Sequence, residues 1–213
     1  MIDLSHPLNP ETPVYPGDPP FALTILDSTA NAVEAGVRPL NVSQIAMNVH
    51  CGTHMDAPYH FFGDGATIDE VALERCVGPT MLVKLPESLH GGRIDALHLS
   101  PFEAKLRQVS RVVLNTGWHR RWGAGDYFSG HPVLTGEAAG FLADCGIQLV
   151  GVDTPSVDRP PFEAHLVFLR RGVLIVENLT NLDAILSEVF QLAAVPLKIS
   201  GRDGSPVRAV ALD

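Results

Sequence analysis

The stretch His50-Cys51-Gly52-Thr53-His54-Met55-Asp56-Ala57-Pro58-Tyr59-His60 packs three histidines and an aspartate into eleven residues. The whole chain has nine histidines, so a third of them lie in this short run. Neutral imidazole is the commonest metal ligand in proteins, and a carboxylate can complete a site for zinc or manganese. The run therefore predicts a metal site.

The spacing within the run favours ligands that converge on one ion. His50 and His54 flank Gly52, where glycine lets the backbone reverse tightly enough to bring both rings together. Asp56 follows His54 by two residues, and such residues point to the same side of an extended chain. We expect Asp56 to join the same ion or to bridge to a second one. Cys51 is a weaker candidate ligand, because it would point away from neighbours that converge. The alternative that needs no metal is a set of histidines satisfied by hydrogen bonds.

The bulk composition suits one compact domain over residues 1–213. The chain has 46% hydrophobic residues, and a domain of this length buries roughly 70% of the surface that its unfolded form exposes. Three cysteines form no disulfide framework, which favours a reducing, cytoplasmic location. We expect no signal peptide and no membrane span. A net charge of −9 disfavours a nucleic-acid partner.

Apolar runs and turn residues divide the rest of the chain into strands and helices. A strand over 41–49 leads into the histidine-rich run, and helices are expected over 135–145 and 162–171. Thr135 can cap the first helix and Gly146 can end it. Further strands are expected over residues 80–85, 111–115, 148–152, 173–176, 190–199 and 207–212. Six prolines within residues 1–20 predict an ordered loop or edge segment. The sum is a mixed α/β fold.

The run also carries a family resemblance. Its pattern His-x-Gly-Thr-His-x-Asp-x-Pro-x-His resembles the signature of the bacterial cyclase-like metal-dependent hydrolases, which include kynurenine formamidases and isatin hydrolases. Further stretches that resemble landmarks of this family lie at residues 3–8, 12–18, 116–118, 151–158, 164–165 and 177–179. The resemblance covers nearly the whole chain. It implies a single mixed-sheet domain with the swivelling β/β/α fold of that family.

The resemblance implies a site with two divalent ions per subunit. One ion would take His50, His54 and Asp56, and Asp56 would bridge to a second ion that His165 and Glu177 also hold. Spacing alone does not select the last two residues, because a lone histidine on a helix is more often a surface residue. Ligands of nitrogen and oxygen admit several metals, with zinc the first expectation and manganese the second.

The resemblance also assigns a proton donor and acceptor, His60, which lies beside the predicted ligands in sequence. It implies hydrolysis of an amide C–N bond, with N-formylkynurenine as the leading substrate. A cyclic amide such as isatin is the alternative substrate. An alternative of another class is a metal-binding protein without catalysis, but such a protein would not need a free base at His60.

Substrate recognition is expected at Tyr15, where kynurenine formamidases usually have tryptophan. A tyrosine ring can still stack on an aromatic substrate, although the pocket would differ. The alternative interpretation is that Tyr15 is an aromatic residue that only packs within a proline-rich loop. The expected partners are a small-molecule amide and further copies of the chain, as a homodimer or homotetramer.

Overall fold

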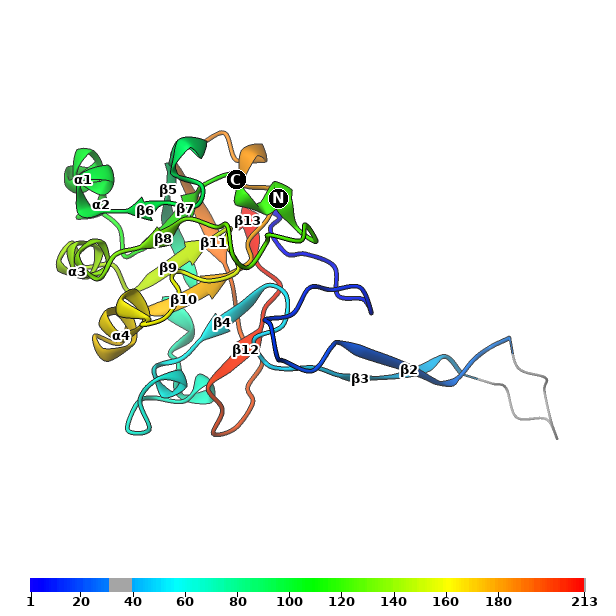
Figure 1. The fold of residues 1–213 in the computed structure, drawn as a ribbon. Coiled ribbons are helices and arrows are strands. Elements are labelled where there is room, and N and C mark those ends of the chain that lie inside the picture. The colour runs from blue at the N-terminus through cyan, green and yellow to red at the C-terminus, as the bar shows by residue number, and fades with distance from the viewer. Residues whose placement is uncertain (31–39, 213) are drawn as a thin grey trace.

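In the computed structural model, which describes residues 1–30 and 40–212, a mixed sheet of nine strands forms the body of the molecule (Figure 1). The strands, in spatial order, are β1 (Ile2–Asp3), β13 (Val210–Leu212), β11 (Val189–Ala193), β5 (Val77–Lys84), β7 (Arg111–Asn115), β9 (Leu149–Val152), β10 (Leu174–Glu177), β4 (His54–Asp56) and β12 (Gly204–Pro206). The predicted mixed α/β fold is confirmed.

The centre of the sheet is parallel and its flanks are antiparallel. β5, β7, β9 and β10 run parallel to one another, whereas β11 and β13 on one side and β4 and β12 on the other pair antiparallel. Every residue of β7, β9 and β10 is buried. Strands that are covered on both faces have continuous apolar sequences, and this is why the sequence predicted this part of the sheet.

Helices cover one side of the sheet in Figure 1, with α3 beside α4. The α-helices are α1 (Ala96–Leu99), α2 (Glu103–Leu106), α3 (Gly136–Asp144) and α4 (Glu163–Arg170). Short 3-10 helices lie at Pro58–His60, Ile68–Glu70, Leu73–Arg75, Glu87–Leu89, Ser100–Phe102, Trp118–Arg121 and Leu182–Ala184, and two short strands, β6 (Arg93–Ile94) and β8 (Val133–Leu134), pair separately.

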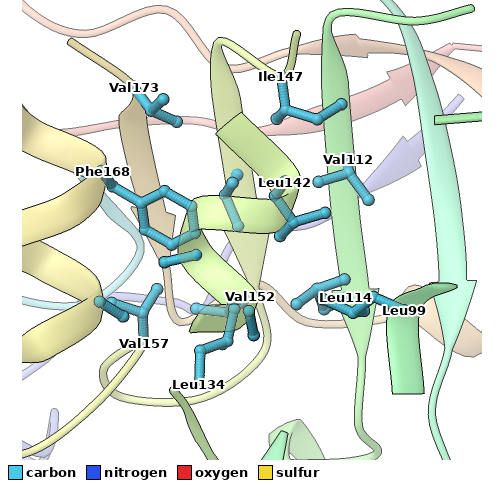
Figure 2. Packing of buried hydrophobic residues seen from close by; sticks show 14 of the residues in the cluster. Leu99, Val112, Leu114, Leu134, Leu142, Ile147, Val152, Val157, Phe168 and Val173 are labelled. Atoms are coloured by element: carbon cyan, nitrogen blue, oxygen red, sulfur yellow. The ribbon is translucent and has the colours of Figure 1, made fainter. Parts of the chain in front are cut away.

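The core between the helices and the sheet fixes α4 in place. Figure 2 shows Phe168 of α4 and Leu142 of α3 packed among apolar side chains, with Val112 and Val152 of the sheet nearby. Thr135 caps α3 by accepting the N–H of Ala138, as the sequence predicted. α4 also carries a predicted site residue, so this packing helps to set the geometry of the site.

A two-stranded arm projects from the body (Figure 1). It consists of β2 (Ala22–Asp27) and β3 (Val42–Ala46), which pair antiparallel with Leu23 opposite Ile45. Leu23, Ile25 and Ile45 are exposed apolar side chains on this arm. The strand that we expected over 41–49 therefore ends at Ala46 and belongs to the arm, because a turn over 49–53 precedes β4.

The other predicted elements have mixed outcomes. The strands expected over 80–85, 111–115, 148–152 and 173–176 and both helices are confirmed to within a few residues at each end. The strand expected over 190–199 ends at Ala193, before Pro196, which has no N–H to continue a ladder. The last strand begins at Val210 rather than residue 207, and β12 was not anticipated. None of the helices among the described residues is long and apolar enough to cross a membrane.

The packing of α4 generates a stability prediction. Phe168→Ala should lower the free energy of unfolding by about 3–5 kcal/mol, because it removes a fully buried ring and leaves a cavity. Leu166→Ala is the matched control on the same helix, since 43% of Leu166 is exposed, and it should cost less than about 1 kcal/mol. Urea unfolding of both variants measures the difference, and equal losses would contradict the packing role of Phe168.

Candidate metal centre and active site

The pairing of β4 with β10 brings three predicted site residues together. His54 and Asp56 alternate along β4 and so share one face of the strand. The antiparallel register places Glu177, the last residue of β10, directly opposite His54. His54 Nε2 lies 3.3 Å from Asp56 Oδ1 and 3.4 Å from Glu177 Oε2. The sheet therefore holds an imidazole between two carboxylates.

His50 reaches the same place from the turn before β4. Gly52 in this turn has a φ of +67°, a left-handed conformation that glycine adopts readily. A Cβ at Gly52 would also lie 2.5 Å from the end of the Leu8 side chain, so a larger residue would force Leu8 to shift as well as strain the backbone. His50 Nδ1 then lies 2.7 Å from Asp56 Oδ1. The expectation that glycine lets this run fold back is confirmed.

His165 comes to the site in the first turn of α4. Its Nδ1 lies 2.6 Å from Asp158 Oδ1, and the other oxygen of Asp158 accepts the N–H of Ala164 at the start of the helix. His165 Nε2 lies 3.7 Å from Asp56 and 3.6 Å from Glu177. Only 3% of His165 is exposed, so the surface position that is usual for a lone helical histidine is wrong here.

Two groups of potential ligand atoms share one carboxylate. His50, His54 and Asp56 form one group, Asp56, His165 and Glu177 form the other, and the atoms within each group lie within 4.8 Å of one another. This arrangement fits the predicted pair of ions with Asp56 between them. Cys51 is in neither group; it is buried, and burial raises the pKa of its thiol.

The outer hydrogen bonds of the ligand groups also suit a metal. His54 Nδ1 donates to the carbonyl of Gly52, and His165 Nδ1 faces Asp158, so Nε2 of each ring is left for the centre. Metal-binding histidines almost always use their second nitrogen in this way. Three imidazoles and two carboxylates then converge, which is a donor set typical of zinc or manganese.

Electrostatics in the centre favour a cation. Burial acts to lower the pKa of His54 and His165, but Asp56 and Glu177, joined by Asp158 at His165, outweigh it and raise both values to about 10. Burial acts to raise the pKa of Asp56, yet the charge of His50 and hydrogen bonds with His165 hold it well below its usual range. The buried carboxylate of Asp56 therefore stays ionised and requires positive charge beside it.

His60 lies at the edge of the centre and belongs to neither of the two ligand groups that share Asp56. Its ring centroid is 4.0 Å from that of His50 and 6.2 Å from that of His165. Burial lowers the pKa of His60 to about 4 against the pull of Asp56, although 30% of the side chain remains exposed. A ring that is neutral at pH 7 and open to the cavity can accept a proton.

A cavity of about 380 Å³ opens over the centre. His60 and Tyr15 both line it, and Tyr15 makes an edge-to-face contact with Phe128 at 5.9 Å between ring centroids. Phe61 and Phe162 also line it, and Phe61 stacks on His165 at 4.8 Å. The cavity size falls within the range of small-molecule sites, and its aromatic walls suit a planar ring.

Some residues of this region were missed in the sequence. Asp158 lies in a stretch quoted only for its family resemblance, and it precedes the helix expected over 162–171, so no local period pairs it with His165. Asp203, whose carboxylate lies 2.6 Å from His50 Nε2, carried no signal at all. No sequence pattern distinguished Phe61, Phe128 and Phe162 from other apolar residues. Only the three-dimensional fold shows that these side chains lie in the region of the site.

Comparison with known proteins identifies the relatives of the chain. The family model described as "Putative cyclase" matches residues 2–159. A protein named kynurenine formamidase from Bacillus mycoides (strain KBAB4) is 35% identical over 98% of this chain and 95% of its own length.

Solved structures show the same fold. Isatin hydrolase A from Labrenzia aggregata, bound to benzyl benzoate, superimposes with a TM-score of 0.85 and 28% identity over 99% of this chain and 92% of that one. A structure described as a potential metal-dependent hydrolase with cyclase activity gives a TM-score of 0.80 and 26% identity over 98% of this chain and 95% of that chain.

The raised pKa values predict that metal binding depends on pH. Below about pH 10, His54 and His165 hold protons that a divalent ion must displace, so the apparent affinity should rise with pH. We expect the zinc affinity to increase by about tenfold per pH unit for each proton displaced between pH 6 and 8. Competition with a chelator measures this increase. An affinity that is the same at pH 6 and pH 8 would contradict it.

Proposed function

Since this chain belongs to the putative cyclase family, we propose that it is a metal-dependent enzyme that hydrolyses the amide C–N bond of an aryl formamide such as N-formylkynurenine. The observation that carries the proposal is a buried histidine–carboxylate cluster at the base of an aromatic cavity, with His60 beside it and outside the two ligand groups that share Asp56. The similarity to a kynurenine formamidase over nearly the whole chain supports the substrate class.

The proposed centre holds two ions. His50, His54 and Asp56 would bind one, and Asp56, His165 and Glu177 would bind the other, with zinc the first choice and manganese the second. When bound, such ions polarise an amide carbonyl and make water a strong nucleophile near neutral pH. The description of a similar structure as a potential metal-dependent hydrolase supports this cofactor.

His60 performs the proton transfers in this proposal. Because its pKa is lowered to about 4, the ring is neutral at pH 7 and can take a proton from the attacking water. The same ring then delivers the proton to the leaving nitrogen, so that the amine departs neutral. His60 lines the cavity in which both of these atoms would lie.

The aromatic wall positions the substrate ring. Tyr15 and Phe128 lie on one part of the cavity, and Phe61 and Phe162 lie nearer to His165. An aryl group between such rings places its formamide over the centre. A cyclic amide is the second candidate, because the isatin hydrolase structure is 28% identical and superimposes over nearly the whole chain.

We further infer that the chain forms a homodimer or homotetramer in the cytoplasm. Leu23 and Ile25 lie two residues apart on β2, and Ile45 lies opposite Leu23, so all three share one face of the projecting arm. An exposed apolar face on a two-stranded arm is suited to burial against a second copy. Three cysteines that are free and buried support a reducing location.

Turnover of model amides tests the function. The wild-type chain loaded with zinc or manganese should hydrolyse N-formylkynurenine, and isatin is assayed in the same buffer. His60→Ala should reduce kcat by about 100- to 10,000-fold, because it removes the proton donor and acceptor, while bound metal stays near the wild-type level.

Three outcomes would overturn parts of this proposal. Bound metal without turnover of any amide or lactam would indicate a metal-binding protein rather than an enzyme. Loss of metal from His60→Ala would indicate that His60 is a ligand. Turnover of isatin alone would select the cyclic amide.

Light scattering tests the assembly. The wild-type chain should have two or four times the mass of one chain, and Ile25→Asp should lower the mass towards one chain by placing a charge on the apolar face of the arm. A wild-type mass of one chain at high protein concentration would contradict the inference.

A further inference from the structure

Asp203 occupies a fixed position just before the edge strand that lies next to the predicted ligands. It directly precedes β12, which pairs with β4 so that Gly204 lies opposite Asp56. The carbonyl of Asp203 accepts the N–H of Ala57 at 2.9 Å. A Cβ at Gly204 would lie 2.7 Å from Cε1 of His50, so the backbone here packs directly against that ring. The ladder that places the ligands therefore places Asp203 as well.

The carboxylate of Asp203 faces two histidines at once. Its Oδ2 lies 2.6 Å from His50 Nε2 and 3.6 Å from His60 Nδ1. The rings of His50 and His60 lie 4.0 Å apart at an angle of 33°. One third of the Asp203 side chain is exposed, so water can solvate the face of the carboxylate that points away from the rings. The carboxylate thus links a predicted ligand to the predicted proton carrier.

The hydrogen bonds of the other two histidines indicate what the contact between Asp203 and His50 does. In each ring, the nitrogen that points away from the centre is Nδ1. It faces the carbonyl of Gly52 in His54 and the carboxylate of Asp158 in His165. For His50 the corresponding acceptor is Asp203, but in this ring the nitrogen that points away from the centre is Nε2. A proton held on Nε2 leaves the lone pair of Nδ1 facing Asp56, where the ion would sit.

We propose that Asp203 is a positioning residue for the hydrolytic centre, an inference that rests on the proposed function. It accepts the Nε2–H of His50 and so selects the tautomer that offers Nδ1 to the metal. The same carboxylate oxygen lies 3.6 Å from His60 Nδ1, so it is beside the ring of His60 as well as that of His50. Asp203 touches neither substrate nor reacting atoms in this role.

Zinc binding and ring tautomers test the proposal without a substrate. Asp203→Ala should weaken zinc binding by about 10- to 100-fold, the usual effect of losing an outer partner of a ligand. Nitrogen NMR of the zinc-loaded chain should show His50 with its proton on Nε2 in the wild type and lose this single form in the variant. With metal saturated, kcat should fall while KM changes little.

Three further variants make the test specific. Asp203→Leu keeps the side-chain volume without an acceptor and should repeat the result of Asp203→Ala. Asp203→Asn can accept the Nε2–H through its amide oxygen and should restore the tautomer and most of the affinity. Asp69→Asn is the matched control, because Asp69 anchors the same loop by accepting the N–H of Gly201 at 2.8 Å and should bind zinc as the wild type does.

Two results would overturn the proposal. Wild-type zinc affinity and an unchanged His50 tautomer in both Asp203→Ala and Asp203→Leu would show that the carboxylate positions nothing. Loss of one whole equivalent of zinc at saturation would show that Asp203 is itself a ligand, in the group that it forms with His50 and His60. Both readouts are independent of turnover, so they are distinguishable from a failure of amide hydrolysis.

Discussion

The antiparallel pairing of β4 with β10 is the constraint on which the site depends. It sets His54 opposite Glu177 and Asp56 opposite Ile175, so that ionised and ionisable groups meet in the interior. Burying carboxylates in this way costs free energy unless positive charge lies beside them. Without a metal ion, only protonated imidazoles can supply that charge here. A divalent ion relieves the same demand, and this is why the geometry favours a metal centre over a set of hydrogen-bonded histidines.

The surrounding elements act by fixing ring orientations. Asp158 begins α4 by accepting backbone N–H groups and also faces His165, so helix start and ring position are coupled. On the other side of β4, the pairing of β12 brings Asp203 to His50. The proposed centre is thus held through strand register on two edges and through one helix packed on the core. Such support is what a preorganised site requires.

The sequence predicted the inner part of the site better than its surroundings. Spacing around Gly52 selected His50, His54 and Asp56, because a tight turn and a two-residue alternation are local properties. Glu177 lies more than a hundred residues further along and joins them only through strand register, which no local pattern contains; it and His165 were named by resemblance. Most central strands were predicted because they are apolar on both faces, whereas β12 is three residues long and has no such pattern.

Anomalous diffraction from crystals of the zinc-loaded chain is the sharpest test of the two-ion centre, because it locates ions independently of any assay. We expect two peaks per chain, one within bonding distance of His50, His54 and Asp56 and the other of Asp56, His165 and Glu177. Peaks elsewhere, or none in this cluster at saturating zinc, would rule out this centre. A structure with Asp56 bound to neither ion would contradict it equally, since the shared carboxylate joins the two halves of the proposed centre.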